Sequence, residues 1–320
     1  MFLRRRAGAG DSTFRLGTGV FALAIVVVVV AIFLELTNRS LPSIARFGFS
    51  FWTSSEWNSV ENNYGAFPFI WGTLYSSILA LIIAGPVAIG IAIFLSELCP
   101  HRLRAPLTAL TELLASIPSI VYGLWGIFVL IPAVRALQIW MPEWLRQTPF
   151  FSGPPYGVSL FAAAIILAIM IIPFTSSVAR EVLKAVPASQ REAAYAMGAT
   201  RWEATKAALH YARTGILGSV LLGFGRALGE TMAVAMVIGN RPVASASVFA
   251  PQYSMAAVIA SEFAEAVEQL HIAALVEIGL VLFVITLVIN GASRLLVWSM
   301  TRERRARTRV VPTTAAEPAA

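Results

Sequence analysis

Two oppositely charged residues lie within a strongly apolar stretch between residues 222 and 240. Arg226 and Glu230 belong to the run LGFGRALGETMAVAMVIGN, inside a longer apolar segment that begins near Ile216. A charged side chain at the centre of a bilayer costs roughly 3 kcal/mol on insertion scales, so both groups must face protein, water or each other. Their spacing of four residues predicts that both lie on one face of a helix, where opposite charges can pair.

Two glycines accompany this pair at the same spacing. Gly225 and Gly229 would form a flat strip on which another helix can approach closely. A close-packing strip beside a fixed positive charge is one way to build an anion pathway between helices. A buried ion pair that only orients two helices explains the same residues, and both interpretations are open at this point.

A second group of candidate residues lies in the polar segment AREVLKAVPASQREAAYAMGATRWEATKAALHYART, residues 179–214. Two capping boxes are predicted to begin helices here, formed by the pairs Ser189–Glu192 and Thr200–Glu203. Gly198, between them, suits the left-handed turn that ends a helix. The pattern therefore predicts a helix, a sharp bend and a second helix. Such a rigid unit can receive force from a soluble partner, and an amphipathic surface helix without a partner fits as well.

The composition places these candidates in a membrane protein. The chain has 320 residues, of which 58% are hydrophobic and 13% charged, and its mean hydropathy is +0.75. Apolar runs of about 20 residues are long enough to cross a bilayer as helices. We predict an all-α integral membrane protein with six such helices, at residues 16–36, 67–95, 106–131, 157–178, 216–238 and 272–300.

The distribution of charge predicts the orientation. The net charge is +7, and most Lys and Arg residues fall in the two tails and in the segments near 101–104 and 180–213. An excess of basic residues marks the cytoplasmic side, so both termini are predicted to be cytoplasmic. The excess of basic residues then reflects the membrane topology and contact with anionic lipid, so nucleic acid is not expected as a partner.

The remaining polar residues carry weaker signals. Glu112, near a cytoplasmic helix end, is expected to snorkel, and Glu277 is expected to be hydrated from the outer side. The acidic residues of the third external segment, at helical spacing, indicate either a solvated face or a contact surface for an external partner; they are Glu262, Glu265 and Glu268. The aromatic residues near 52–67 are expected at the membrane interface. Cys99 cannot form an internal disulfide and is expected to be inert.

Two classes of activity find no support in the residues. The chain has no G-x(4)-G-K-[ST] loop for nucleotide phosphates, so it is not expected to bind ATP. Its three histidines are scattered, no His/Cys cluster suggests a metal, and Glu112 and Glu277 are too isolated to form an acid–base pair. A membrane enzyme is the weakest interpretation.

The segment EAAYAMGAT resembles the EAA-x(3)-G signature of ABC-importer permeases, here Glu192, Ala193, Ala194 and Gly198. A longer likeness, from about Phe67 to Asn240, is to the phosphate-specific permeases of the PstC type. It rests on FPFIWGTLYSSILALIIAGPVAIGIAIFLSE, ELLASIPSIVYGLWGIFVL, IMIIPFTSSVAREVLKAVPASQREAA and GFGRALGETMAVAMVIGN. One position departs from the pattern: many EAA loops end in Leu-Pro, whereas Leu209 is followed by His210, so the second helix is expected to continue into the next span.

This resemblance implies a type I ABC-importer permease fold in the inner membrane of a bacterium. The EAA loop, about residues 187–212, would dock on a separate ATPase dimer of the PstB type, which alone would hold ATP and magnesium, so no cofactor is expected on this chain. A PstA-type sister permease would complete the pathway, and a PstS-type external protein would deliver phosphate. Arg226 and Glu230 would line the pathway, and Gly225 and Gly229 would pack helices.

The domain organisation follows from these assignments. We predict a basic N-terminal tail (1–15), a first helix with its external loop (16–66), the permease domain (67–300) and a basic, disordered C-terminal tail (301–320). Two alternatives to a phosphate permease stay open. One is an importer of another oxyanion, such as phosphonate, molybdate or sulfate. The other is a membrane scaffold or sensor in phosphate signalling.

Overall fold

The computed structural model describes the backbone of residues 9–308 and the side chains of residues 14–299. Almost all of this part is helical. Its long helices are α1 (Ala9–Phe47), α3 (Phe67–Ile93), α4 (His101–Ser116), α8 (Leu160–Lys184), α10 (Arg201–Leu228) and α13 (Gln269–Thr308). The shorter ones are α2 (Ser50–Thr53), α5 (Ser119–Trp125), α6 (Ile131–Trp140), α7 (Glu143–Arg146), α9 (Ala188–Ala196), α11 (Met232–Ala235) and α12 (Met255–Glu262). Two π-helical turns, η1 (Phe94–Leu98) and η2 (Gly126–Leu130), and one hairpin, β1 (Trp57–Asn58) with β2 (Asn63–Tyr64), are the other regular elements of the described residues.

Five helical segments within the described residues are long and apolar enough to cross a membrane. They are Phe14–Phe47, Phe67–Leu98, Ser119–Trp140, Leu160–Lys184 and Gln269–Ser299. The sixth predicted span corresponds to the C-terminal half of α10, which packs among α3, α8 and α13 but is not apolar enough to meet the same criterion. A sixth crossing and the cytoplasmic location of both termini therefore stay predictions.

The third predicted span is divided in two. The sequence predicts one helix over residues 106–131, whereas α4 ends at Ser116 and α5 begins at Ser119. Ile117 is extended, with ψ 129°, because the proline that follows disfavours the helical conformation in the residue before it. The apolar crossing then runs from α5 through η2 into α6, and α4 becomes a separate helix on which no residue is buried.

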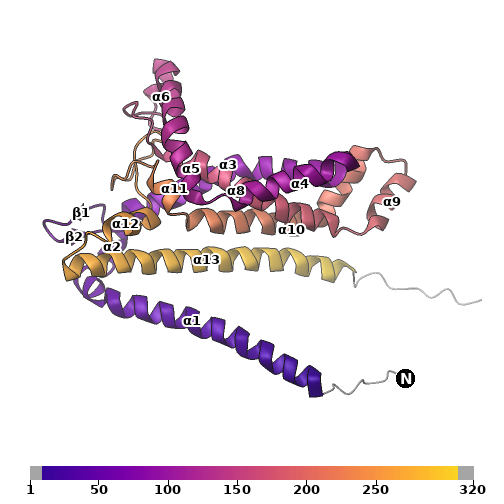
Figure 1. Cartoon of the computed structure of the whole chain (residues 1–320), viewed down its shortest axis with the longest axis horizontal. Helices are drawn as coiled ribbons and strands as arrows, with labels where there is room; N and C mark the ends of the chain where they lie inside the picture. Colours follow the sequence, from indigo (N-terminus) through magenta and orange to yellow (C-terminus); the bar gives the residue numbers. More distant parts are fainter. Residues whose placement is uncertain (1–8, 309–320) are drawn as a thin grey trace, which may run out of the picture.

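The centre of the bundle is formed by α3, α8 and α10 (Figure 1). Small residues of α3 and α8, among them Ala80, Ala84, Ala162 and Ala163, are fully or almost fully buried between them. Such side chains allow helix axes to approach closely, which is the favoured packing in a membrane. In Figure 1, α13 lies along one side of this bundle and α1 lies outside α13, close to it at one end and diverging toward the other.

The two ends of the bundle differ. At one end of Figure 1, α2, the β1–β2 hairpin and α12 are close together, and α9 stands at the opposite end. The aromatic residues predicted at the membrane interface form part of a packed cluster here: Tyr64 is 1% exposed and its ring meets those of Trp57 and Phe47 edge-on. The expectation of an interfacial set is corrected for Tyr64, because the hairpin folds it inward against α12 and α13.

Helix boundaries also differ at the two tails. α1 begins at Ala9 and extends to Phe47, so it covers part of the predicted N-terminal tail and of the first external loop. α13 continues to Thr308, which makes the first part of the predicted disordered C-terminal tail helical. The other residues of both tails, 1–8 and 309–320, lie outside the described residues.

Candidate functional site

The segment that carries Arg226 and Glu230 is not one continuous helix. α10 ends at Leu228, Gly229 is its C-cap, and α11 begins only at Met232. The prediction that both charges share a helical face is therefore wrong, and the described residues contain no ion pair between them. Arg226 occupies the last turn of α10, where its positive charge is favourable because the C-terminal end of a helix carries partial negative charge.

Arg226 is exposed in this chain and has an aromatic neighbour. Its guanidinium carbon lies 5.4 Å from the centroid of the Phe174 ring of α8, a cation–π contact that leaves the N–H groups available. Its charge also acts electrostatically on the hydroxyl group of Tyr122 in α5. Within the described part of the chain, the guanidinium makes no ion pair or hydrogen bond to a protein group. It is therefore a cation with free donors at the end of α10, near α5 and α8.

The two predicted packing glycines have different surroundings. A Cβ atom at Gly225 would lie 3.1 Å from the side-chain oxygen of Asn290, so α13 approaches α10 closely there. A Cβ atom at Gly229 would meet nothing within 4 Å. α10 also approaches α8 closely at Gly223, which lies against the side chain of Thr175 and which sequence reasoning missed. A packing role for Gly229 stays a prediction.

The EAA loop forms a helix, a bend and a second helix, as predicted. Gly198 has φ +83° and so makes the left-handed turn after α9. Thr200 and Glu203 form the predicted capping box: the Thr200 N–H donates to a Glu203 carboxylate oxygen at 2.8 Å and the Glu203 N–H donates to the Thr200 hydroxyl at 3.4 Å. The other predicted box is wrong, because Pro187 is the N-cap of α9 and Ser189 lies inside the helix. α10 continues past His210, as expected.

The residues of the EAA signature have different exposures. Glu192 and Ala193 are exposed, whereas Ala194 is buried at 7% exposure and fixes one face of α9 to the rest of the protein. Tyr195 and Met197 are 50% and 85% exposed on the same short helix and its end. The loop thus presents an uncovered surface at one end of the bundle.

An unpredicted ion pair holds α9 in place. Arg191 donates to both carboxylate oxygens of Glu97 in η1, at 2.6 and 3.2 Å, and to the carbonyl oxygens of Leu183 and Val186, each at 3.0 Å. The fork of the guanidinium matches a carboxylate, so the contact is directional as well as attractive. Since η1 continues α3 without a gap, Arg191 connects the EAA loop directly to a helix at the centre of the bundle.

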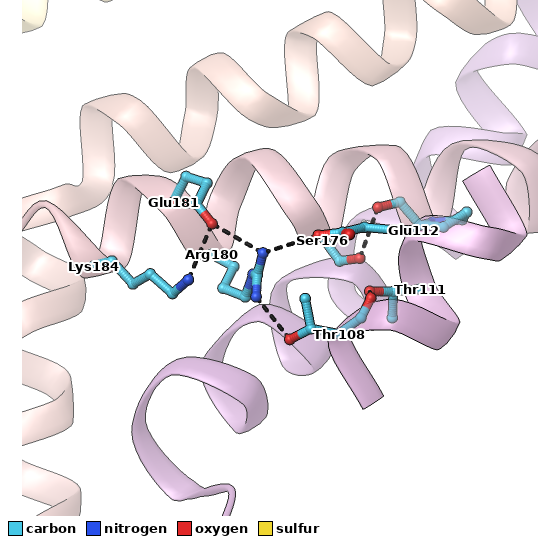
Figure 2. A network of polar contacts seen from close by, with 8 residues as sticks. Thr108, Thr111, Glu112, Ser176, Arg180, Glu181 and Lys184 are labelled. Carbon is cyan, nitrogen blue, oxygen red and sulfur yellow. Dashed lines mark hydrogen bonds and ion pairs between the residues drawn. The ribbon is translucent and has the colours of Figure 1, made fainter. Parts of the chain in front are cut away.

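A second unpredicted network surrounds Arg180 (Figure 2). Arg180 is 7% exposed and donates to the Thr108 hydroxyl at 2.7 Å. Its other terminal nitrogen lies 3.4 Å from a carboxylate oxygen of Glu112 and 2.9 Å from one of Glu181. Glu112 therefore has a cationic partner on α8. The sequence predicted only that its side chain snorkels, not that it pairs with Arg180.

At the other end of the bundle, the three predicted carboxylates surround a cavity of about 580 Å³. They do not share one helix, because α12 ends at Glu262 and α13 begins after Glu268. Trp57 donates to Glu262 at 2.9 Å, and His271 lies 3.3 Å from the same carboxylate. Burial, reinforced by the charges of Glu268 and Glu262, raises the pKa of Tyr64.

Glu277 is buried in this chain. It is 3% exposed on α13, and its Oε2 atom has no hydrogen-bond partner among the described residues. The expectation of a wet carboxylate is therefore wrong, because α13 is covered on this side by neighbouring helices that the sequence alone does not reveal.

The chain is similar to known membrane transport proteins. Residues 88–302 match the model of the family described as "Binding-protein-dependent transport system inner membrane component". A protein named phosphate transport system permease protein PstC from Mesorhizobium japonicum is 46% identical over 91% of this chain and 90% of its own length. A protein of the same name from Pasteurella multocida is 48% identical over 89% of this chain and 90% of its length.

A solved structure supports the fold. The chain resembles a chain of the MetNI methionine ABC transporter in an inward-facing conformation, with a TM-score of 0.55 and 18% identity over 72% of this chain and 94% of that one. At this identity the likeness concerns the fold alone. The chain belongs to the family of binding-protein-dependent transport system inner membrane components, and it is a multi-pass inner-membrane protein with the ABC-importer permease fold.

Proposed function

We propose that the chain is the transmembrane permease subunit of an ATP-driven importer of inorganic phosphate and forms half of its translocation pathway. The relatives that are 46–48% identical over about nine-tenths of the chain carry the name of phosphate transport permeases. The structural observation that carries the proposal is Arg226, an exposed guanidinium with free donors at the end of α10, between α5 and α8.

The chemistry of this group suits the substrate. Phosphate at neutral pH is a mixture of mono- and dianion, and the planar fork of arginine matches its oxygens. A charge at membrane depth is costly unless it serves a polar partner or pathway, which an oxyanion in a shared cavity would provide. Glu230, just beyond the helix end, is proposed to compete for the guanidinium during the cycle and so to keep phosphate binding transient.

The energy for transport is proposed to come from a separate ATPase dimer of the PstB type, where ATP and magnesium would bind. Glu192, Ala193, Ala194 and Gly198 belong to the docking segment, and the exposed surface of α9 is available for this contact. A sister permease of the PstA type would cover Arg226 from the other side of the pathway. An external phosphate-binding protein of the PstS type would dock at the opposite end, with both termini of this chain in the cytoplasm.

The test replaces Arg226 in the assembled complex. Arg226→Gln removes the charge and should lower phosphate uptake into vesicles by at least 10-fold, since hydrogen bonds to charged groups are worth about 1.5–3 kcal/mol. Arg213→Gln, an exposed arginine on the same helix, is the matched control and should leave uptake within about twofold of wild type. Both variants should co-purify with the partner subunits.

Wild-type uptake by an assembled Arg226→Gln complex would remove Arg226 from the pathway. Substrate identity is tested separately by competing labelled phosphate with molybdate, sulfate and phosphonate. If one of these anions inhibited phosphate uptake efficiently at a concentration equal to that of phosphate, that anion would replace phosphate as the proposed substrate.

A further inference from the structure

Arg180 is a buried cation with partners on two different helices (Figure 2). Its Nη1 atom donates to Thr108 of α4, whereas Nη2 lies between Glu112 of α4 and Glu181 of its own helix, α8. The contact to Glu181, at 2.9 Å, is shorter than that to Glu112, at 3.4 Å. The guanidinium is therefore shared between a carboxylate that moves with α8 and one that moves with α4.

This sharing makes the contact between the two helices reversible. Breaking a buried ion pair is costly when it leaves an unpaired charge. If α4 moves away from α8, Arg180 loses Thr108 and Glu112 but keeps Glu181, so its charge stays paired. Both carboxylates are more than half exposed, which allows each to exchange its partner for water without a large penalty.

The helix held by this contact has little else to hold it within the chain. No residue of α4 is buried, and α4 packs mainly on α8. The Arg180 network is thus a principal polar attachment of α4, and separation of the two helices would disturb no apolar core of this chain.

Movement of α4 would be transmitted to the region of Arg226. α4 leads through the break at Ile117 and Pro118 into α5, and the Tyr122 hydroxyl of α5 donates across this break to the Leu114 carbonyl at 2.9 Å. α5 in turn packs closely on α11 and the residue that follows it: a Cβ atom added at Gly123 would lie 3.2 Å from the Cα atom of Ala233 and 2.5 Å from the sulfur of Met236. On the other side, α8 ends at Lys184, and a short connection, residues 185–187, leads from it to α9.

We propose that Arg180 is a positioning residue that latches α4 to α8 and releases it once in each transport cycle by passing from Glu112 to Glu181 alone. The proposal rests on the proposed function, since it assigns the latch to the transfer of movement from α9 to the pathway. The latched state holds α5 beside Arg226. The released state lets α5 turn about the break before Pro118.

Glu112 and Glu181 then have opposite roles, so replacing each of them should have a different effect. Glu112→Gln weakens the latch, so nucleotide-driven movement no longer reaches α5 and ATP is hydrolysed without transport. Glu181→Gln removes the alternative partner, so α4 stays latched and both hydrolysis and transport slow together. Lys184→Met is the matched control, because Lys184 also binds Glu181, at 3.1 Å, but has no ion pair with α4 among the described residues.

The experiment measures phosphate transported per ATP hydrolysed by the full complex in vesicles. Network residues typically change coupling by 0.5–2 kcal/mol, so the ratio should fall about 2- to 30-fold in Glu112→Gln. In Glu181→Gln the ratio should be unchanged while both rates fall by a similar factor. Lys184→Met should keep the wild-type ratio and rates. Because both glutamates are exposed, their substitution is not expected to prevent folding.

A distance measurement in the same complex gives a second readout. Spin labels are placed at Leu110 of α4 and Lys184 of α8 after Cys99, the single cysteine, is replaced by serine. Wild type should show two distances whose populations change with nucleotide, Glu112→Gln should favour the longer one, and Glu181→Gln the shorter one. The latch is overturned if both glutamate variants have the same ratio and distance distribution. Failure of the wild-type complex to transport phosphate would instead overturn the proposed function.

Discussion

The attachment of α9 by Arg191 gives a prediction whose size follows from the structure. Arg191→Met removes four hydrogen bonds, two of them to Glu97, and leaves that carboxylate without its cation. The side chains of Arg191 and Glu97 are 23% and 12% exposed, so the pair is largely but not fully buried. Breaking a buried ion pair from one side costs about 3–5 kcal/mol, and the residual exposure places this pair near the lower figure.

A loss of about 3 kcal/mol raises the population of complexes with α9 detached by about two orders of magnitude. Hydrogen exchange of the α9 amide groups, followed by mass spectrometry on the complex in lipid discs, measures this population directly. Exchange should become up to about 100-fold faster in Arg191→Met, limited by the protection that α9 has in the wild type. Lys206→Met, at an exposed lysine of α10, is the control and should leave α9 unchanged.

A double substitution separates the lost attraction from the unpaired charge. Arg191→Met combined with Glu97→Gln leaves no charge at this contact, so the α9 amides of the double variant should exchange more slowly than those of Arg191→Met alone. The reasoning is refuted if Arg191→Met exchanges like the Lys206→Met control. It is also refuted if the double variant is the sum of the two single variants, because the two residues would then not interact.

Two further predictions concern packing and pH. Gly72→Ala should lower the free energy of unfolding by about 1–3 kcal/mol, measured by thermal unfolding, because the new methyl group would collide with the backbone carbonyl of Tyr253. Gly85→Ala on the same helix is the control, because a methyl group has open space there. An equal loss of stability in Gly85→Ala would contradict the argument. The hydrogen bonds that the Thr200 N–H and hydroxyl donate to Glu203 lower the pKa of its carboxyl group below the ordinary value of 4.5. The stability that this cap contributes is therefore fully present above pH 4.5 and is lost as the pH falls through the lower pKa of the folded state. Exchange of the first α10 amides should accelerate over this acidic range in wild type and be pH-independent, apart from intrinsic exchange, in Glu203→Gln; identical profiles would show that the cap does not contribute.

Local signals predicted the elements that depend on local chemistry. The apolar runs placed three of the five crossing helices closely, those at residues 67–95, 157–178 and 272–300, because bilayer thickness sets their length. Gly198 and the Thr200–Glu203 box were recognised because a left-handed turn and a reciprocal cap need only residues within one turn of each other. The likeness of residues 67–240 to phosphate permeases agrees with the matched family, which spans residues 88–302.

Only the tertiary structure determined which charges meet. Arg180 and Glu112 are far apart in sequence, as are Arg191 and Glu97, and no local pattern brings either pair together. The pair that did look local, Arg226 and Glu230, is separated because the helix ends between them. The physical reason is the same for the two pairs that do form: a long polar side chain takes its partner from the helical segment packed beside it, and the packing of helices is decided by surfaces that lie far apart along the chain.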